Sequence, residues 1–130
     1  MSKRLRHLWL FVAFVAMGLL GLHCYMLDGL TGWFFSLDVP NNTVYASAYT
    51  DAAFRKIKVG MTTNEVQTIL GTPLCVYGEK DPTGKPWKYY EQIGELWQYS
   101  KAIEDLSFHV RNIVFKNGKV HEIVCEYYVD

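Results

Sequence analysis

The longest pattern in the chain is an uninterrupted apolar run, free of formal charge, from Leu8 to Tyr25. It is about as long as the ~20 residues that a helix needs to cross the hydrocarbon core of a bilayer. A basic cluster precedes it and consists of Lys3, Arg4 and Arg6. Because basic residues gather on the cytoplasmic side, the pattern predicts one transmembrane helix within residues 1–27, with a cytoplasmic N-terminus. Everything after it would lie outside the cytoplasm.

Two other N-terminal signals share this pattern. A cleaved signal peptide needs a small-x-small triplet after the apolar run, and the segment Leu20–Cys24 provides none. Lipidation of Cys24 would require a leucine three positions earlier and a small residue directly before it, where Gly21 and His23 stand. We therefore favour an uncleaved anchor over either alternative.

Aromatic residues flank the apolar run. Trp9 lies near one end, and Trp33, Phe34 and Phe35 lie beyond the other. Such rings prefer the membrane–water interfaces, although they are equally compatible with an ordinary hydrophobic linker. Glycine, proline and asparagine interrupt any period over residues 28–50, so we interpret this segment as a tether to a folded domain at residues 51–130.

The strongest helix signal begins at Thr62. Its hydroxyl can cap a helix while Glu65 reaches back to the cap N–H, which is a capping box. Val66, Ile69 and Leu70 then share one face, and a glycine and a proline end the pattern, predicting a helix over Thr63–Leu70. A shorter helix is expected before it, near Asp51–Ile57, with Asp51 as its cap.

Two β-rich runs near the C-terminus, Leu106–Phe115 and Val120–Val129, are separated by a segment containing Asn117-Gly118. Asn-Gly favours a type I′ hairpin. That turn would pair Phe115 with Val120, Arg111 with Val124, and His109 with Glu126. We expect a third strand at Glu95–Ser100, with Trp87–Tyr89, or a helix over Ile93–Ser100, as alternatives.

This register assigns the hairpin residues to two faces. The face expected to pack on the helices holds Leu106, Phe108, Val110, Val114, Ile123, Cys125, Tyr127 and Val129. The other face has more apolar residues than solvent normally sees, which predicts a partner-binding surface unless the tether or a loop covers it. The candidate residues on that face are Arg111, Ile113, Phe115, Val120, Val124 and Tyr128.

Charge and chemistry narrow the function classes. Lys plus Arg equals Asp plus Glu at 13 each, and no basic patch lies beyond the N-terminus, so we expect no nucleic-acid partner. The cysteines lack zinc spacing, and His109 and His121 are expected on opposite faces of the hairpin without a nucleophile nearby. We therefore predict no catalytic site, metal or cofactor. Cys75 and Cys125 either form a disulfide outside the cytoplasm or remain separate thiols.

The helix at Thr63–Leu70, two Trp-x-Tyr units (Trp87–Tyr89 and Trp97–Tyr99) and the final hairpin together resemble the SmpA/OmlA (BamE-like) family of envelope proteins over about residues 52–128. The motif residues are Gly60, Met61, Thr62, Glu65, Val66, Leu70, Gly71 and Pro73. The resemblance implies an α+β fold in which two short helices pack on a three-stranded antiparallel sheet. Family members of this kind are usually outer-membrane lipoproteins, whereas this sequence shows a spanning helix instead of a lipobox.

The combined expectation is a membrane-tethered, non-catalytic interaction module of the bacterial envelope. Its anchor would cross the inner membrane once, its domain would be periplasmic, and its partners would be the membrane and another envelope protein. The family's role suggests outer-membrane assembly or stability. The alternative from another class is a small periplasmic enzyme or ligand-binding protein, for which a large pocket with converging polar groups would be the evidence.

Overall fold

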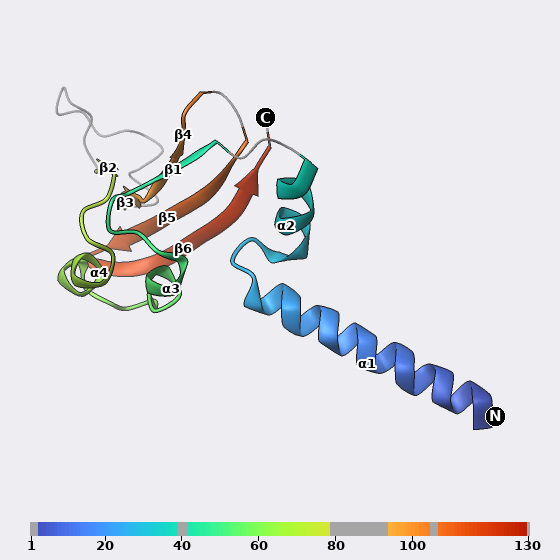
Figure 1. Cartoon of the computed structure of the whole chain (residues 1–130). Helices are drawn as coiled ribbons and strands as arrows, with labels where there is room; N and C mark the ends of the chain where they lie inside the picture. Colours follow the sequence, from blue (N-terminus) through green and yellow to red (C-terminus); the bar gives the residue numbers. More distant parts are fainter. Residues whose placement is uncertain (1–2, 39–41, 79–93, 105–106, 130) are drawn as a thin grey trace.

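The computed structural model describes residues 3–38, 42–78, 94–104 and 107–129 (Figure 1). Its helices are α1 (Lys3–Tyr25), α2 (Gly29–Asp38), α3 (Asp51–Phe54) and α4 (Thr63–Leu70). Its strands are β1 (Thr43–Tyr45), β2 (Cys75–Tyr77), β3 (Glu95–Gln98), β4 (Ser100–Ala102), β5 (Phe108–Lys116) and β6 (Lys119–Tyr128).

Helix α1 extends away from the rest of the molecule, and none of its residues is buried (Figure 1). Within the described ranges it is the one helix long and apolar enough to cross a membrane, judged by length and composition. It begins earlier than the apolar run, because Lys3–His7 continue the helix before Leu8. The sequence therefore correctly predicted an N-terminal apolar helix.

The strands form two antiparallel sheets, one four-stranded in the order β2-β3-β5-β6 and one two-stranded, β1-β4. The α+β class is confirmed, but the expected three-stranded sheet is wrong. A strand does form at Glu95–Gln98, within the predicted range, and this strand β3 pairs with β5, which excludes the alternative helix there. After Tyr99 the chain leaves this sheet, and β4 pairs with β1. Trp87–Tyr89 lie outside the described residues.

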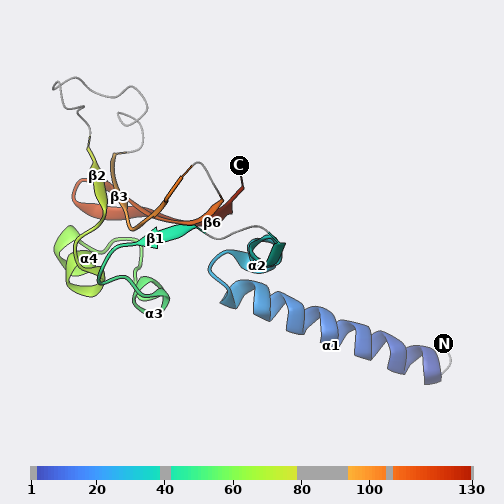
Figure 2. The same cartoon turned by 45° about the horizontal axis from the view of Figure 1, so that its top comes forward.

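The segment expected to be a tether is structured. Residues 28–50 contain α2, which lies beside β6, and the short strand β1 (Figures 1 and 2). The two glycines that suggested a linker have local roles here. Gly29 begins α2 with a positive φ of 66°, and Gly32 lies where the helix approaches β6. Part of what appeared to be linker is therefore folded, and α2 packs beside β6.

The helix caps agree closely with the sequence at α4. Thr62 accepts a hydrogen bond from the Glu65 backbone, and the Glu65 carboxylate accepts one from the Thr62 N–H at 2.7 Å, which completes the predicted capping box. Helix α3 differs, because Thr50 rather than Asp51 is its cap. It also ends at Phe54 instead of Ile57.

The β5–β6 hairpin turns at Asn117 and Gly118, which both have positive φ, as a type I′ turn requires. Phe115 pairs with Val120 as predicted. A bulge follows, and Val114 pairs with Glu122, so His121 is the extra residue in β6. The predicted pairs of Arg111 with Val124 and His109 with Glu126 are wrong.

The bulge moves Ile123, Cys125 and Tyr127 onto the same face as Ile113, because a one-residue slip turns side chains to the opposite face. This inner face packs on α3 and α4 around Phe54, Val66 and Leu70. Four predicted partner-binding residues are therefore buried, each no more than 2% exposed: Arg111, Ile113, Phe115 and Val120. Their predicted exposure is wrong.

The opposite, outer face of the sheet carries Phe108, Val110 and Val114, which had been assigned to the helix-packed face. Val110 and Val114 are nevertheless buried there. Val124 and Tyr128 lie on this outer face, where Tyr128 is 47% exposed and its ring is 5.8 Å from that of Phe108. Leu106 lies outside the described residues.

The cysteines do not meet. Cys75 lies on β2 and Cys125 on β6, at opposite edges of the four-stranded sheet. Two intervening strands place them roughly 14 Å apart at the usual strand spacing. A disulfide needs Cα atoms within about 7 Å, so the disulfide hypothesis is wrong. All three cysteines are free thiols in this structure.

Candidate functional site

A buried ion pair joins the turn after α1 to the sheet. Asp28, in the turn between α1 and α2, faces Arg111 at the centre of β5. The two guanidinium nitrogens Nη1 and Nη2 donate to Oδ1 at 2.5 Å and to Oδ2 at 2.7 Å. The Asp28 side chain is 10% exposed and the Arg111 side chain is 2% exposed. This bidentate geometry is the strongest form of an arginine–carboxylate contact.

Three further side chains complete what we call the junction cluster, which consists of Asp28, His109, Arg111, Tyr49 and Asp51. The Nδ1 atom of His109 lies 2.8 Å from Asp28 Oδ2. Tyr49 accepts a hydrogen bond from Arg111 Nε at 3.0 Å and donates one to Asp51 at 2.6 Å. Arg111 also donates to the Val110 carbonyl, so its buried donors have partners on several elements.

The electrostatics of the cluster favour the charged pair. Burial raises the pKa of Asp28, but hydrogen bonds from His109 and Arg111 and the guanidinium charge lower it more, to about 2 against an ordinary 3.8. Burial lowers the pKa of Arg111, and the hydrogen bonds and charge of Asp28 raise it more. Burial and the hydrogen bond to Asp51 raise the pKa of Tyr49. At neutral pH the pair is therefore ionised and the phenol protonated.

Two more contacts tie α1 to the domain. Arg55, after α3, donates to the backbone carbonyl of Tyr25, one of the carbonyls that a helix end leaves without an internal partner. Its guanidinium also lies 4.7 Å from the centre of the Tyr25 ring. Within the turn, the Leu30 N–H donates to His23 Nδ1 at 3.0 Å. The end of α1 is thus held by the sheet and by the segment after α3.

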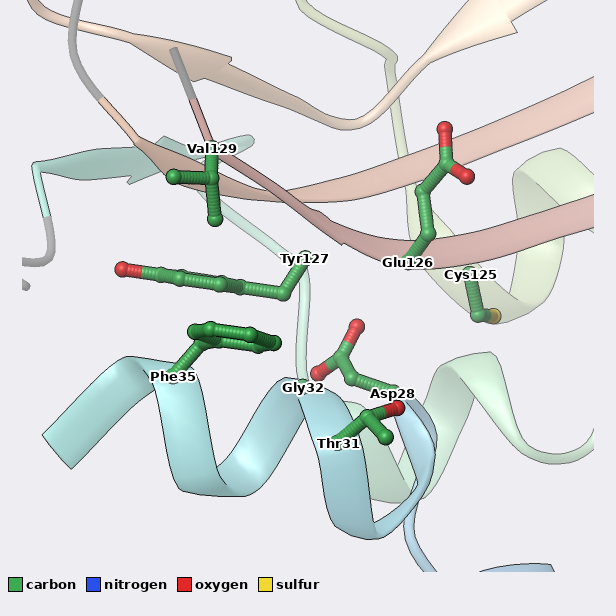
Figure 3. Close-up of a pocket in the computed structure, with 8 residues that line it drawn as sticks. All are labelled: Asp28, Thr31, Gly32, Phe35, Cys125, Glu126, Tyr127 and Val129. Carbon is green, nitrogen blue, oxygen red and sulfur yellow. The ribbon is translucent and has the colours of Figure 1, made fainter.

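A cavity of about 390 Å³ lies beside the junction cluster, between α2 and β6. Figure 3 shows Phe35 and Tyr127 pointing toward each other across it, while Glu126 points away from α2. The Asp28 carboxylate already binds Arg111, and burial raises the pKa of the neighbouring Cys125 thiol, which disfavours its reactive thiolate form. The cavity therefore lacks the converging free polar groups of an active site.

The described residues contain no group of three or more His, Cys, Asp and Glu side chains that could hold a metal ion. His109 and His121 do not act together, because His109 binds Asp28 on the inner face and His121 is the exposed bulge residue. The predicted pair of His109 with Glu126 is replaced by the one with Asp28. The junction cluster joins the turn after α1 to β5 and to the start of α3.

Several motif residues of the predicted family contribute to the core or to turns of the backbone. Val66 and Leu70 are fully buried, and Met61 packs against the same core. Gly60 and Gly71 have φ values of 92° and 71°, which favour glycine. Sequence reasoning missed Asp28. The available signal was Arg111 itself, since an arginine within an otherwise apolar strand needs a buried acidic partner.

Comparison with known proteins agrees with the resemblance. A family model described as the outer membrane protein assembly factor BamE domain matches residues 47–94. The match includes α3, α4 and β2 and ends before β3, so it is shorter than the sequence had suggested. No curated protein matches the chain. The predicted resemblance is confirmed over the helical part of the domain, and α1, α2 and the hairpin lie outside it.

Proposed function

We propose that the chain is a membrane-anchored, non-catalytic interaction module of the bacterial envelope that acts in outer-membrane assembly or stability. The match of residues 47–94 to the BamE domain carries this proposal, since the matched description is that of an assembly factor. The exposed apolar helix α1 supports the anchor. The basic residues at its start favour a cytoplasmic N-terminus, a single pass through the inner membrane and a periplasmic domain.

The outer sheet face is the surface we propose for the protein partner. It retains two of the residues predicted from the sequence, Val124 and Tyr128, and adds Phe108. Tyr128 is largely exposed and belongs to an aromatic pair, the type of rigid apolar group that anchors protein interfaces. The inner face is excluded because it forms the core. The alternative of an enzyme or ligand-binding protein has less support, because the Asp28 carboxylate beside the α2–β6 cavity already binds Arg111.

Photo-crosslinking in intact cells tests the proposal. A photoreactive phenylalanine analogue at Tyr128 should give a defined adduct that mass spectrometry identifies as an envelope protein. Val59 provides the matched control, because it is 68% exposed and lies in the α3–α4 loop, away from the outer sheet face. The proposal that the outer sheet face binds the partner would be refuted by the same adducts at both positions, or by no adduct at Tyr128.

A further inference from the structure

Helix α2 has one face against the domain. A Cβ atom at Gly32 would lie 3.2 Å from Tyr127 Cβ and 2.5 Å from Asp28 Cβ, so the close approach of α2 to β6 depends on glycine. Phe35 points toward Tyr127 from the same side of the helix (Figure 3). This inner side of α2, together with Asp28 before it, is therefore committed to the domain.

The outer side of α2 is apolar and contributes no residue to the described hydrophobic core, although Trp33 also lines a hollow with Arg55 and His109. Its residues recur at the i, i+3, i+4 and i+7 spacing of one helical face. We call this set the outer stripe: Leu30, Trp33, Phe34 and Leu37. Trp33, Phe34 and Leu37 are 47%, 64% and 67% exposed, and no charged residue occurs from Gly29 to Leu37. A shallow apolar hollow of about 400 Å³ lies on this helix.

The position of α2 relative to α1 indicates what covers the stripe. Only Met26–Asp28 separate the two helices, and the His23–Leu30 hydrogen bond fixes the turn. In both views α2 lies crosswise to α1, on the side of the domain from which α1 extends (Figures 1 and 2). A helix that begins where a spanning helix ends lies at the depth of the membrane–water interface.

We propose that α2 lies in the outer interface of the same bilayer that α1 spans, with the outer stripe inserted among the lipids. This inference rests on the proposed membrane anchor. Amphipathic helices with Trp and Phe on one side bind in this way, and aromatic rings prefer this depth. The occupant is lipid rather than protein, because continuity with α1 brings the stripe to the bilayer whatever else the domain binds.

Helix α2 and the junction cluster would then act together. The helix binds the domain through Gly32 and Asp28 on one side and lipid through the outer stripe on the other. The domain would then have a fixed orientation over the membrane, with the outer sheet face presented in a defined direction. A flexible tether would give no such orientation.

Quenching by brominated lipid tests this placement. The full chain would be reconstituted in phosphatidylcholine vesicles brominated in the upper part of the acyl chains. The fluorescence of Trp33 is obtained as the difference between the wild type and Trp33→Phe. Trp9→Phe reports on α1 in the same way, and Trp97→Phe reports on a tryptophan 8% exposed in the domain core. We expect at least a twofold loss of Trp33 and Trp9 emission and little change for Trp97.

The controls separate the two proposals. Quenching of Trp9 without quenching of Trp33 would overturn the insertion of α2 into lipid while leaving the membrane anchor intact. In that case, protection of Trp33 from aqueous iodide would point to a second copy of the chain as the occupant instead of lipid. Absence of quenching at both tryptophans would overturn the docking and the membrane anchor together.

Discussion

Asp28→Asn is the most informative single substitution, because it neutralises the carboxylate with almost no change in shape. Arg111 would stay buried with its positive charge uncompensated. Lowering the pKa of Asp28 from 3.8 to about 2 corresponds to about 2 kcal/mol of favourable interaction in the folded protein. Breaking one partner of a buried pair typically costs about 3 to 5 kcal/mol. We therefore expect a destabilisation of about 2 to 4 kcal/mol.

The matched control is Asp51→Asn. This carboxylate faces the same guanidinium, with Oδ1 4.0 Å from Arg111 Nε, but its side chain is 60% exposed. Exposed pairs contribute about 0 to 1 kcal/mol, so the same chemical change should have a small effect here. The comparison isolates the contribution of burial and bidentate geometry from that of charge alone.

The measurement is a double-mutant cycle on the full chain in detergent micelles, with denaturant unfolding followed by near-UV circular dichroism. It combines Asp28→Asn with Arg111→Met. Because the double variant leaves neither charge unpaired, it should be more stable than the sum of the single effects by about 1.5 kcal/mol or more. A coupling below about 0.5 kcal/mol, or equal effects of Asp28→Asn and Asp51→Asn, would refute the buried pair.

Thiol labelling gives a second readout of the same substitution. Cys125 lies beside Asp28 in the cavity between α2 and β6, so release of α2 should expose it. We expect faster modification of Cys125 in Asp28→Asn than in the wild type, with Cys75 on the opposite edge strand unchanged. If Cys125 is modified at the same rate in both proteins, α2 stays packed on β6 without the ion pair.

Four other results are expected. Gly71→Val should destabilise the protein by about 1 kcal/mol or more, because φ is 71° and a Cβ would lie 2.7 Å from Ala48 Cβ. The control is Thr72→Val at an exposed position, and equal unfolding midpoints for the two variants would contradict this prediction. Stability should fall as pH drops from 3.8 toward 2, since the Asp28 pKa is lowered on folding, and pH titration of unfolding should show this acid limb weakened in Asp28→Asn. In denatured, unreduced protein, Cys75 and Cys125 should both react with a thiol reagent, and protection of both would revive the disulfide. Intact mass should place the N-terminus at or near Met1, whereas a start between Leu22 and Thr31 would indicate a cleaved signal.

The parts of the fold that the sequence predicted depend on short-range chemistry. The capping box joins Thr62 to a residue three positions away, and the hairpin turn is determined by two adjacent residues, Asn117 and Gly118. Such signals act whatever the rest of the chain does. The α4 bounds and the β5–β6 turn were therefore predictable from the sequence alone.

The faces of the sheet were not predictable from the turn, because the bulge at His121, three residues after Gly118, changes the register. A signal was nevertheless present in the order of residues. Without a bulge, Glu122 would face the core beside Ile113, whereas skipping one residue places Ile123 and Cys125 there. Burial of a carboxylate without a partner is unfavourable, and this constraint decides the register over simple alternation.

The buried pair was beyond local reasoning for a different reason. Asp28 and Arg111 are separated by 83 positions, and nothing in the sequence near either residue identifies the other. The glycines around Asp28 are typical of a linker, so Asp28 was not considered as a structural residue. The exposed stripe on α2 was also not predictable from the sequence. It can be identified only once the structure shows that Gly32 lies against the domain on the opposite side of the helix.

The junction cluster links the segment after α1 to the stability of the domain. Arg111 is among the most deeply buried side chains of the described chain, and its carboxylate partner comes from the turn that follows α1. A domain separated from residue 28 would retain a buried guanidinium without that partner, which is a strongly destabilising state. The segment matched by the BamE domain, residues 47–94, contains neither Asp28 nor Arg111. Under the proposed function, this chain therefore combines a family interaction fold with its own attachment to the membrane, so that correct mounting of the domain and its folding depend on the same ion pair.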